Sequence, residues 1–182
     1  MVKNFYKNKK VLITGATGFK GAWLSYWLNI LGAKVYGIGH NPNKNKNLFY
    51  SLKLDKKIKL KLLDIRDKNK IKKFIISNKP QIIFHLAAQP LILESYKNPY
   101  LTYTVNSIGT LNVLETVRQI SSVRSLICIT SDKCYESNYS TKGFKEDDRL
   151  GGKDPYSGSK ASAEIIINSY QESFFKSKNC GA

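Results

Sequence analysis

Three evenly spaced glycines behind an apolar segment restrict the fold of this chain more than any other feature. The segment Val11-Leu-Ile-Thr14 has the composition of a buried strand, and Gly15, Gly18 and Gly21 follow at intervals of three residues. Glycine at the first position permits a sharp strand-to-helix turn, and at the second it lets backbone amides approach a pyrophosphate. At the third it lets the helix pack close on the strand. The spacing is one residue longer than the common dinucleotide fingerprint, and such glycines also occur in plain turns.

The residues that follow predict a helix, which supports the dinucleotide-binding interpretation. Apolar and aromatic side chains recur there at helical spacing, and we interpret them as core packing rather than as a ligand site. They are Phe19, Ala22, Trp23, Tyr26, Trp27, Ile30 and Leu31.

Strands alternate with helices along the rest of the chain. Apolar or alternating segments predict strands at 33–39, 58–63, 81–88 and 125–130. Helices are predicted at 68–77 (with Asp67 as its cap), 99–120 and 155–175, and a short one within the polar segment 41–57. On the helix at 99–120 the apolar residues expected near one side are Leu101, Val105, Ile108, Leu111 and Val117. This alternation predicts an α/β fold with a doubly wound parallel sheet, the Rossmann fold.

Net charge, hydropathy and cysteine spacing limit which ligands and compartments we expect for this protein. The 182 residues carry a formal net charge of +17, but the lysines are scattered, so we expect anionic ligands such as nucleotides rather than nucleic acid. No segment approaches the roughly 18 to 20 apolar residues of a membrane span, and the basic N-terminus lacks the apolar core of a signal peptide. Cys128, Cys134 and Cys180 lack the spacing of metal ligands. These features predict a cytoplasmic protein with no metal site and no membrane contact.

The end of the second predicted strand leaves the choice of dinucleotide open. An acidic residue commonly holds the ribose hydroxyls there, whereas this chain has Gly39-His40-Asn41, with Lys44 and Lys46 beyond. Asp64 and Ile65 fall at the carboxyl end of the third strand, where adenine rings are usually held. The residues of this loop therefore do not distinguish NAD from NADP.

Two groups of polar residues are candidates for chemistry. Tyr156 and Lys160 lie four residues apart in a predicted helix, so both project from one face, and an ammonium beside a phenol stabilises the phenolate. Ser131-Asp132-Lys133 directly follows the fifth strand, at the sheet edge where ligands of open α/β sheets bind. The first pair also occurs on ordinary solvated helices, and the second group could simply cap a turn. Asn106 lies inside a predicted helix, where asparagine is usually exposed.

The chain resembles the extended short-chain dehydrogenase/reductases. The resemblance rests on the segments 14–21 (TGATGFKG), 64–66 (DIR) and 85–88 (HLAA), with Asn106 and Tyr156-x-x-x-Lys160. More narrowly, the chain is similar to the nucleotide-sugar 4,6-dehydratases that act on CDP-glucose, through 18–24, 85–90, 130–136 and 150–157. This implies NAD as cofactor and CDP-glucose as substrate. Members of the family continue into a smaller substrate lobe, so we expect residues 1–182 to form a truncated NAD-binding Rossmann domain, incomplete at its C-terminal side.

The resemblance also implies residue roles. Tyr156 would take the proton of the sugar 4-hydroxyl while hydride leaves C4, Lys160 would hold the nicotinamide ribose, and Ser131 would hydrogen-bond the 4-oxygen. Asp132 is expected as the acid and Lys133 as a candidate base for loss of water across C5 and C6, after which hydride returns to C6. Most relatives carry a glutamate where Lys133 stands. The residues implied for cofactor binding are Gly15, Thr17, Gly18, Phe19, Lys20, Gly21, Asp64, Ile65, Leu86, Ala87, Ala88, Asn106, Tyr156 and Lys160.

Two alternatives remain open, and one assembly is expected. A related epimerase or reductase would keep Tyr156 and Lys160 without needing Asp132 and Lys133. The other alternative is a non-catalytic dinucleotide-binding or regulatory module. Family members usually pair through two helices of each subunit, and the matching segments here are 99–120 and 155–175. We therefore expect a homodimer for the complete protein.

Overall fold

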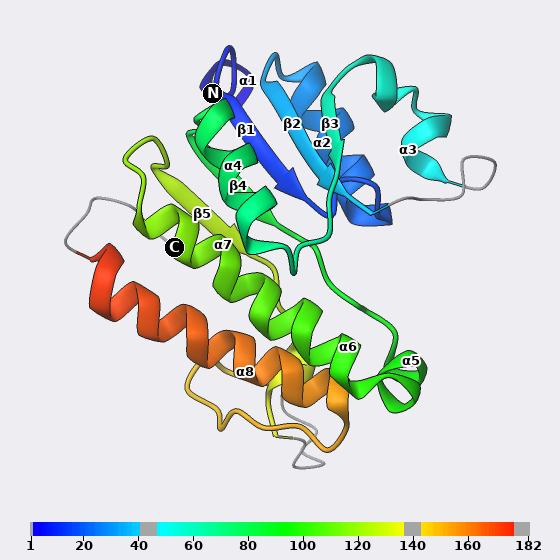
Figure 1. The fold of residues 1–182 in the computed structure, drawn as a ribbon, viewed down its shortest axis with the longest axis vertical. Coiled ribbons are helices and arrows are strands. Elements are labelled where there is room, and N and C mark those ends of the chain that lie inside the picture. Colours follow the sequence, from blue (N-terminus) through cyan, green and yellow to red (C-terminus); the bar gives the residue numbers. More distant parts are fainter. Residues whose placement is uncertain (1, 41–46, 137–142, 177–182) are drawn as a thin grey trace.

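A parallel sheet of five strands forms the centre of the structure. The computed structural model describes residues 2–40, 47–136 and 143–176. Its strands lie in the order β3-β2-β1-β4-β5 (Figure 1), and their bounds are β1 Lys10–Thr14, β2 Lys34–Gly39, β3 Lys59–Leu62, β4 Ile82–His85 and β5 Ser125–Cys128. The strand order reverses between β1 and β4, where Thr14 is the register partner of His85. This confirms the predicted doubly wound sheet, whose ligand crevice lies at such a reversal.

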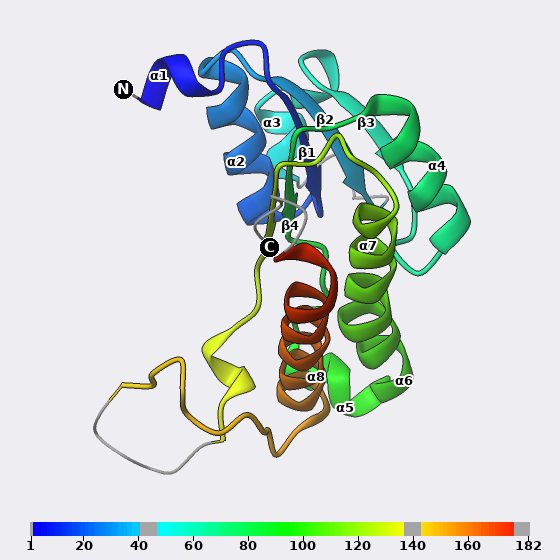
Figure 2. The same cartoon turned by 90° about the vertical axis from the view of Figure 1, so that its left-hand side faces the viewer.

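Helices cover both faces of the sheet. Figure 2 shows α2 and α3 on one face and α4 and α7 on the other, with α8 alongside α7. The α-helices are α1 Val2–Phe5, α2 Phe19–Ile30, α3 Leu48–Ser51, α4 Lys68–Asn78, α5 Ile92–Lys97, α6 Pro99–Tyr103, α7 Gly109–Arg118 and α8 Pro155–Tyr170. Shorter turns are η2 Leu54–Lys56 and η4 Asp132–Cys134, which are 3₁₀-helical, and η3 Thr104–Ile108 and η5 Gln171–Phe175, which are π-helical. Each face has its own apolar core, which for α2 and α3 includes Ala22, Leu28 and Phe49.

The aromatic residues of α2 are the main correction to the sequence-based expectations. Phe19, Trp23, Trp27 and Ile30 do not pack in the core but are between 47% and 73% exposed. The buried face consists of small residues and one leucine, namely Gly21, Ala22, Ser25 and Leu28. At Gly21 the start of the helix approaches the turn after β1 too closely for any side chain, and the rings turn outward.

The helix expected at 99–120 is interrupted. It divides into α6, the π-helical turn η3 and α7, and the extra residue of a π-turn rotates the following face. Ile108 is consequently 45% exposed, whereas Asn106 and Ser107 are buried. The short helices α1 and α5 were not expected from the sequence, but the cap at Asp67 is confirmed, because its Oδ1 accepts a hydrogen bond from the Lys70 amide at 3.1 Å.

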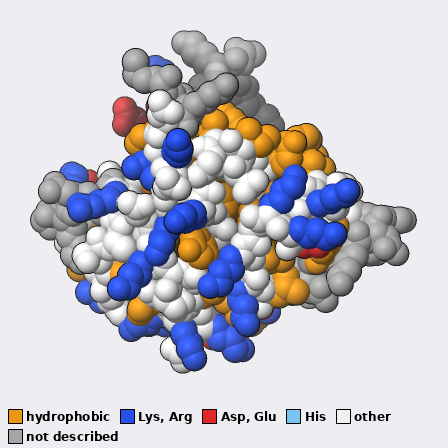
Figure 3. Space-filling model, turned by 90° about the horizontal axis from the view of Figure 1, so that it is seen from above, with side chains coloured by type: hydrophobic (Ala, Val, Ile, Leu, Met, Phe, Trp, Pro, Cys, Tyr) orange, Lys and Arg blue, Asp and Glu red, His pale blue; other side chains and the backbone are white. Residues whose placement is uncertain are grey.

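The upper face of the molecule carries its basic side chains without concentrating them in one patch. Figure 3 shows Lys and Arg side chains dispersed over the upper face of the molecule, interleaved with neutral and apolar groups. Among the described residues, no helix combines the length and the apolar character needed to span a bilayer.

Candidate functional site: a glycine-turn cavity beside a tyrosine and a lysine

The turn after β1 needs glycine at two of its three positions. Gly15 has φ +71°, and a Cβ there would lie 2.8 Å from the Ala87 nitrogen. A Cβ on Gly21 would lie 2.1 Å from the carbonyl oxygen of Gly15. The turn is therefore held tightly between the start of α2 and the segment after β4, and any side chain at either position would push them apart.

The first turn of α2 presents unused amides. Gly18 is its N-cap and has no side chain to bond them, and the Ala22 amide is the first to donate back, to Gly18 O at 2.8 Å. The amides of Phe19, Lys20 and Gly21 therefore precede the helical hydrogen-bond ladder. Such amides, together with the helix dipole, form a binding site for an anion such as phosphate.

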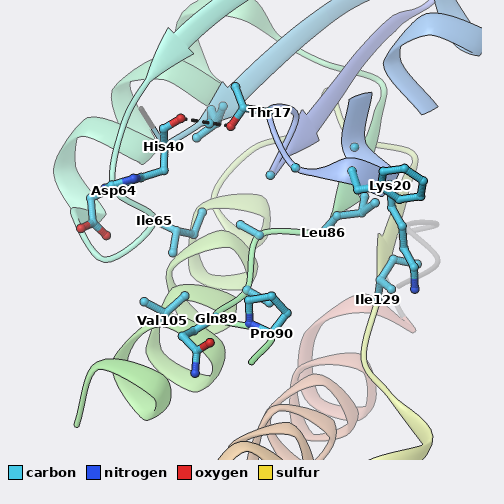
Figure 4. Close-up of a pocket in the computed structure, with 18 of the residues that line it drawn as sticks. Thr17, Lys20, His40, Asp64, Ile65, Leu86, Gln89, Pro90, Val105 and Ile129 are labelled. Carbon is cyan, nitrogen blue, oxygen red and sulfur yellow. Dashed lines mark hydrogen bonds between the residues drawn. The ribbon is translucent and has the colours of Figure 1, made fainter. Parts of the chain in front are cut away.

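A cavity of about 710 Å³ opens at this turn and is called the glycine-turn cavity below. In Figure 4, His40 and Asp64 lie towards one end of it, Lys20 and Ile129 towards the other, and Leu86 between them. All but one of the residues predicted to bind a cofactor line it; these are Gly15, Thr17, Gly18, Phe19, Lys20, Gly21, Asp64, Ile65, Leu86, Ala87, Ala88, Tyr156 and Lys160.

The exception is Asn106, which is 1% exposed and does not line the cavity. Its Oδ1 accepts from the Gln89 amide at 2.8 Å, and its Nδ2 donates to Gln89 O at 3.1 Å and to Ser159 Oγ at 2.9 Å. It is therefore neither exposed nor in contact with the cavity: it joins the segment after β4 to α8.

The end of the cavity near β3 is ionic. Arg66 pairs with Asp64 at 2.5 Å, and its backbone amide donates to Asp64 Oδ1 at 2.9 Å. The hydrogen bonds from Arg66 hold the pKa of Asp64 below its usual value, against a smaller opposing effect of burial. At the end of β2, Thr17 Oγ1 donates to His40 O at 3.1 Å (Figure 4). Lys44 and Lys46 lie outside the described residues.

Tyr156 and Lys160 project from the first turns of α8 into the same cavity. The helix begins at Pro155, and Asp154 caps it by accepting a hydrogen bond from the Ser157 amide at 3.0 Å. Lys160 is only 6% exposed, and its Nζ donates to Ile129 O at 3.3 Å. Burial lowers the pKa of Lys160, and the nearby carboxylate of Glu164 acts in the opposite direction. A half-buried phenol thus lies one helical turn from a buried amine.

Ser131, Asp132 and Lys133 lie outside the glycine-turn cavity. Ser131 and Asp132 line a neighbouring cavity of about 580 Å³, called the strand-exit cavity below. Ser131 caps η4, because its Oγ accepts from the Lys133 amide at 3.2 Å, and the same hydroxyl donates to Asp132 Oδ1 at 3.2 Å. The Lys133 side chain is exposed and lines neither cavity.

His85 is a buried residue of this region that sequence reasoning did not single out as functional. Its Nδ1 lies 2.7 Å from Thr14 Oγ1 and its Nε2 lies 3.0 Å from Thr110 Oγ1. Because the Thr110 hydroxyl donates to Asn106 O, it must accept from Nε2–H, which leaves Nδ1 as the acceptor. Burial lowers the pKa of His85 to about 3, so the ring is neutral. Only the fold brings its two threonine partners together, so the sequence held no signal for them.

The described residues contain no group of three His, Cys, Asp or Glu side chains that could hold a metal ion. Cys128 and Cys134 are free thiols, and burial raises the pKa of Cys128 to about 12. Cys180 lies outside the described residues.

Solved structures share this fold. An epimerase from Methanothermobacter thermautotrophicus is 26% identical with a TM-score of 0.82, and the match covers 94% of this chain and 50% of that chain. The NAD complex of UDP-glucose 4-epimerase from Thermus thermophilus is 26% identical with a TM-score of 0.76, covering 91% of this chain and 52% of that one.

Curated relatives are similar over nearly the whole chain. CDP-glucose 4,6-dehydratase of Salmonella typhimurium is 43% identical over 177 residues, which are 97% of this chain and 49% of the relative. CDP-paratose 2-epimerase of Salmonella typhi is 30% identical over 91% of this chain and 54% of its own length. The chain thus spans about half the length of these relatives. The family model described as GDP-mannose 4,6 dehydratase matches residues 12–179, and the chain therefore belongs to this family.

Proposed function

We propose that this chain is the NAD-binding and catalytic half of a nucleotide-sugar 4,6-dehydratase that acts on CDP-glucose. The observation that carries the proposal is the placement of Tyr156 and Lys160 on one face of α8, in the cavity that the glycine turn opens. The 43% identity to a CDP-glucose 4,6-dehydratase supports this substrate. The product would be CDP-4-dehydro-6-deoxy-D-glucose.

The residues that line the cavity suit NAD in their chemistry. The free amides of residues 19–21 would receive the pyrophosphate, with Lys20 beside them, and the missing side chains of Gly15 and Gly21 let the turn that presents these amides pack tightly. Asp64 and Ile65 would hold the adenosine end, and Lys160 the nicotinamide ribose. A relative with a similar fold was solved with NAD, which supports this cofactor over NADP. When bound, NAD supplies the acceptor that takes a hydride from C4 and returns it to C6.

The residues of the chain would move the protons. Tyr156 would act as the base that takes the proton of the sugar 4-hydroxyl, with Lys160 one helical turn away, and Ser131 would hydrogen-bond the 4-oxygen. Asp132 would act as the acid that protonates the leaving 6-hydroxyl, with Lys133 as the candidate base that takes the C5 proton and returns it to C5 when hydride reaches C6. Asp132 has the stronger structural support of the two, because it lines the strand-exit cavity next to Ser131.

An epimerase or reductase of the same family is the second candidate. It is favoured by the 30% identity to CDP-paratose 2-epimerase and by the epimerases among the solved structures of similar fold. Such an enzyme would use Tyr156 and Lys160 but would not remove water, so analysis of the product separates the two. A dinucleotide-binding module without catalysis is the third candidate.

The complete protein is proposed to be a cytoplasmic homodimer that supplies a deoxysugar for lipopolysaccharide O-antigen. Pairing would use the segments 99–120, which comprise α6, η3 and α7, and 155–175, which comprise α8 and η5. The apolar side chains exposed on these segments support it, among them Ile108, Ile165 and Phe174. Sedimentation of a full-length polypeptide carrying residues 1–182 tests this: a stable monomer at micromolar concentration would contradict the assignment.

The function is tested by supplying CDP-glucose and NAD to the same full-length polypeptide. We expect loss of water from the sugar with no net accumulation of NADH. Tyr156→Phe should lower turnover by about 10³-fold, because it removes the acid–base group. Tyr96→Phe is the matched control, since Tyr96 is exposed and lies outside both cavities. Unchanged turnover in Tyr156→Phe would remove the catalytic assignment, and a product that retains its oxygen would favour the epimerase.

A further inference from the structure

Glu164 lies on α8 in line with the two proposed active-site residues. Tyr156, Lys160 and Glu164 are spaced four residues apart, so they succeed one another along one side of the helix. The first two line the glycine-turn cavity, whereas Glu164 lines the strand-exit cavity. Nothing in the proposed chemistry uses Glu164.

Two consecutive residues that follow β5 are hydrogen-bonded to α8. Lys160 Nζ donates to Ile129 O at 3.3 Å, and Thr130 Oγ1 donates to Glu164 Oε1. Consecutive residues of the strand exit are therefore held by consecutive turns of one helix. Two hydrogen bonds one helical turn apart fix both the position and the direction of residues 129–130, whereas a single hydrogen bond would fix only the position.

The hydrogen bond between Thr130 and Glu164 lies where the two cavities meet. Thr130 lines both of them, and the next residue is Ser131, which lines the strand-exit cavity and caps η4. A shift of Thr130 would be passed directly to Ser131 through the peptide bond that joins them. The distance between the Ser131 hydroxyl and Tyr156 on α8 thus depends on how firmly Thr130 is held.

We propose that Glu164 is a positioning residue, which by accepting the Thr130 hydroxyl hydrogen fixes Ser131 and the turn η4 relative to Tyr156 and Lys160. This inference rests on the proposed function for its consequence on turnover, but not for its structural content. It assigns Glu164 no contact with substrate or cofactor.

Two substitutions separate the hydrogen bond of Glu164 from its charge, which matters because other charged groups surround it. The charged groups near Glu164 are Lys160 on α8 and, in the strand-exit cavity, Asp132, Lys145 and Glu146; the thiols of Cys128 on β5 and Cys134 in η4 also lie close to it. Replacing Glu164 by glutamine retains the acceptor oxygen and removes the charge. Replacing it by leucine removes both.

The test uses a full-length polypeptide that carries residues 1–182. The single variants are Thr130→Val, Glu164→Leu and Glu164→Gln, and the double variant combines Thr130→Val with Glu164→Leu. Glu172→Gln is the matched control, since Glu172 is exposed and pairs with Lys176. The structural signature is amide hydrogen exchange at Lys133 and Cys134, which donate to Ser131 Oγ and Ser131 O. The functional readouts are kcat, KM and NAD affinity.

Thr130→Val and Glu164→Leu should each speed exchange of these two amides by about tenfold and lower kcat by about tenfold. KM and NAD affinity should stay within about twofold, and the double variant should be no worse than either single variant. Glu164→Gln should lose less kcat than Glu164→Leu, because its oxygen still accepts the hydrogen bond although the charge that raises the pKa of Lys160 is gone.

Additive effects of Thr130→Val and Glu164→Leu would overturn the proposal, and so would equal losses in Glu164→Gln and Glu164→Leu. If Glu164→Leu does not fold, Thr130→Val is compared with Thr130→Ser, which keeps the hydroxyl. A loss of kcat in the valine variant alone supports the positioning role, and equal kcat in the two variants refutes it. If the wild type converts no CDP-glucose, the proposed function fails, while the exchange measurement still tests the role of Glu164.

Discussion

Asn106 donates a hydrogen bond from Nδ2 to Ser159 Oγ at 2.9 Å, which connects the π-helical turn η3 to α8 across 53 residues of sequence. Ser159 precedes Lys160, and the same asparagine holds both the N–H and the C=O of Gln89. One buried amide thus fixes the distance between the segment after β4, which lines the cavity, and the helix that carries Tyr156 and Lys160.

Asn106→Ala should destabilise the chain by about 3 kcal/mol. The substitution leaves the Gln89 amide and carbonyl and the Ser159 hydroxyl without this partner in a buried site, and each such loss costs about 1 kcal/mol or more. Urea denaturation of wild type and variant measures the difference. Asn69→Ala, at an exposed position on α4, should change stability by less than about 0.5 kcal/mol. A similar small effect of Asn106→Ala would show that water replaces its hydrogen bonds.

Gly21→Ala should both destabilise the protein and weaken dinucleotide binding. The new Cβ would lie 2.1 Å from Gly15 O, so the start of α2 must move away from the turn. We expect a loss of about 2 kcal/mol and at least a tenfold weaker NAD affinity by titration calorimetry. At Gly143 a Cβ meets nothing within 4 Å, so Gly143→Ala is the matched control and should bind like wild type. Equal NAD affinity in both variants would contradict the anion site at α2.

Stability should fall in mild acid because of His85. Its pKa is about 3 in the folded chain and 6.5 ordinarily, so the unfolded state binds more protons between these values. The stability that depends on the neutral ring is therefore present above pH 6.5 and is lost as pH falls towards 3, at up to about 1.4 kcal/mol per pH unit.

The measurement is urea denaturation between pH 7 and 4.5. His85→Gln should flatten the slope because glutamine supplies a donor and an acceptor without titrating. His40→Gln, which replaces the exposed histidine of the chain, is the matched control. Parallel curves for His85→Gln and wild type would show that the buried ring does not control the acid response.

Tyr170→Phe should loosen the contact between α7 and the end of α8. The Tyr170 hydroxyl donates to Glu115 Oε2 at 2.9 Å, and Arg118 pairs with the same carboxylate at 2.6 Å. We expect a loss of about 1 kcal/mol at pH 7, measured by denaturation against Tyr96→Phe as control.

The same carboxylate gives this contact a pH dependence. Hydrogen bonds from Arg118, together with a smaller one from Tyr170, lower the pKa of Glu115 to about 2, below its ordinary value of 4.5. Its contribution to stability is therefore present above pH 4.5 and is lost as pH falls towards 2. A Glu115→Gln variant that keeps the full wild-type acid response would contradict this.

Local pattern was sufficient for the sheet and for most of the helices. The strand at β1, the glycine turn and the cap at Asp67 depend on neighbouring residues, so their conformations can be read from short segments. The same is true of Tyr156 and Lys160, whose spacing alone puts them on one face of a helix. The outward turn of Trp23 and Trp27 was not predictable in this way, because helical spacing does not say which side of α2 meets the sheet.

What the sequence by itself determined is the order of strands and helices and the residue types available at the sheet edge. What only the tertiary structure decided is which of them meet: Asn106 with Gln89 and Ser159, His85 between its two threonines, and Thr130 with Glu164. The physical reason is that hydrogen bonds between residues distant in sequence depend on how the elements pack. A single π-turn at η3 changes which side chains are buried without leaving a recognisable local signal.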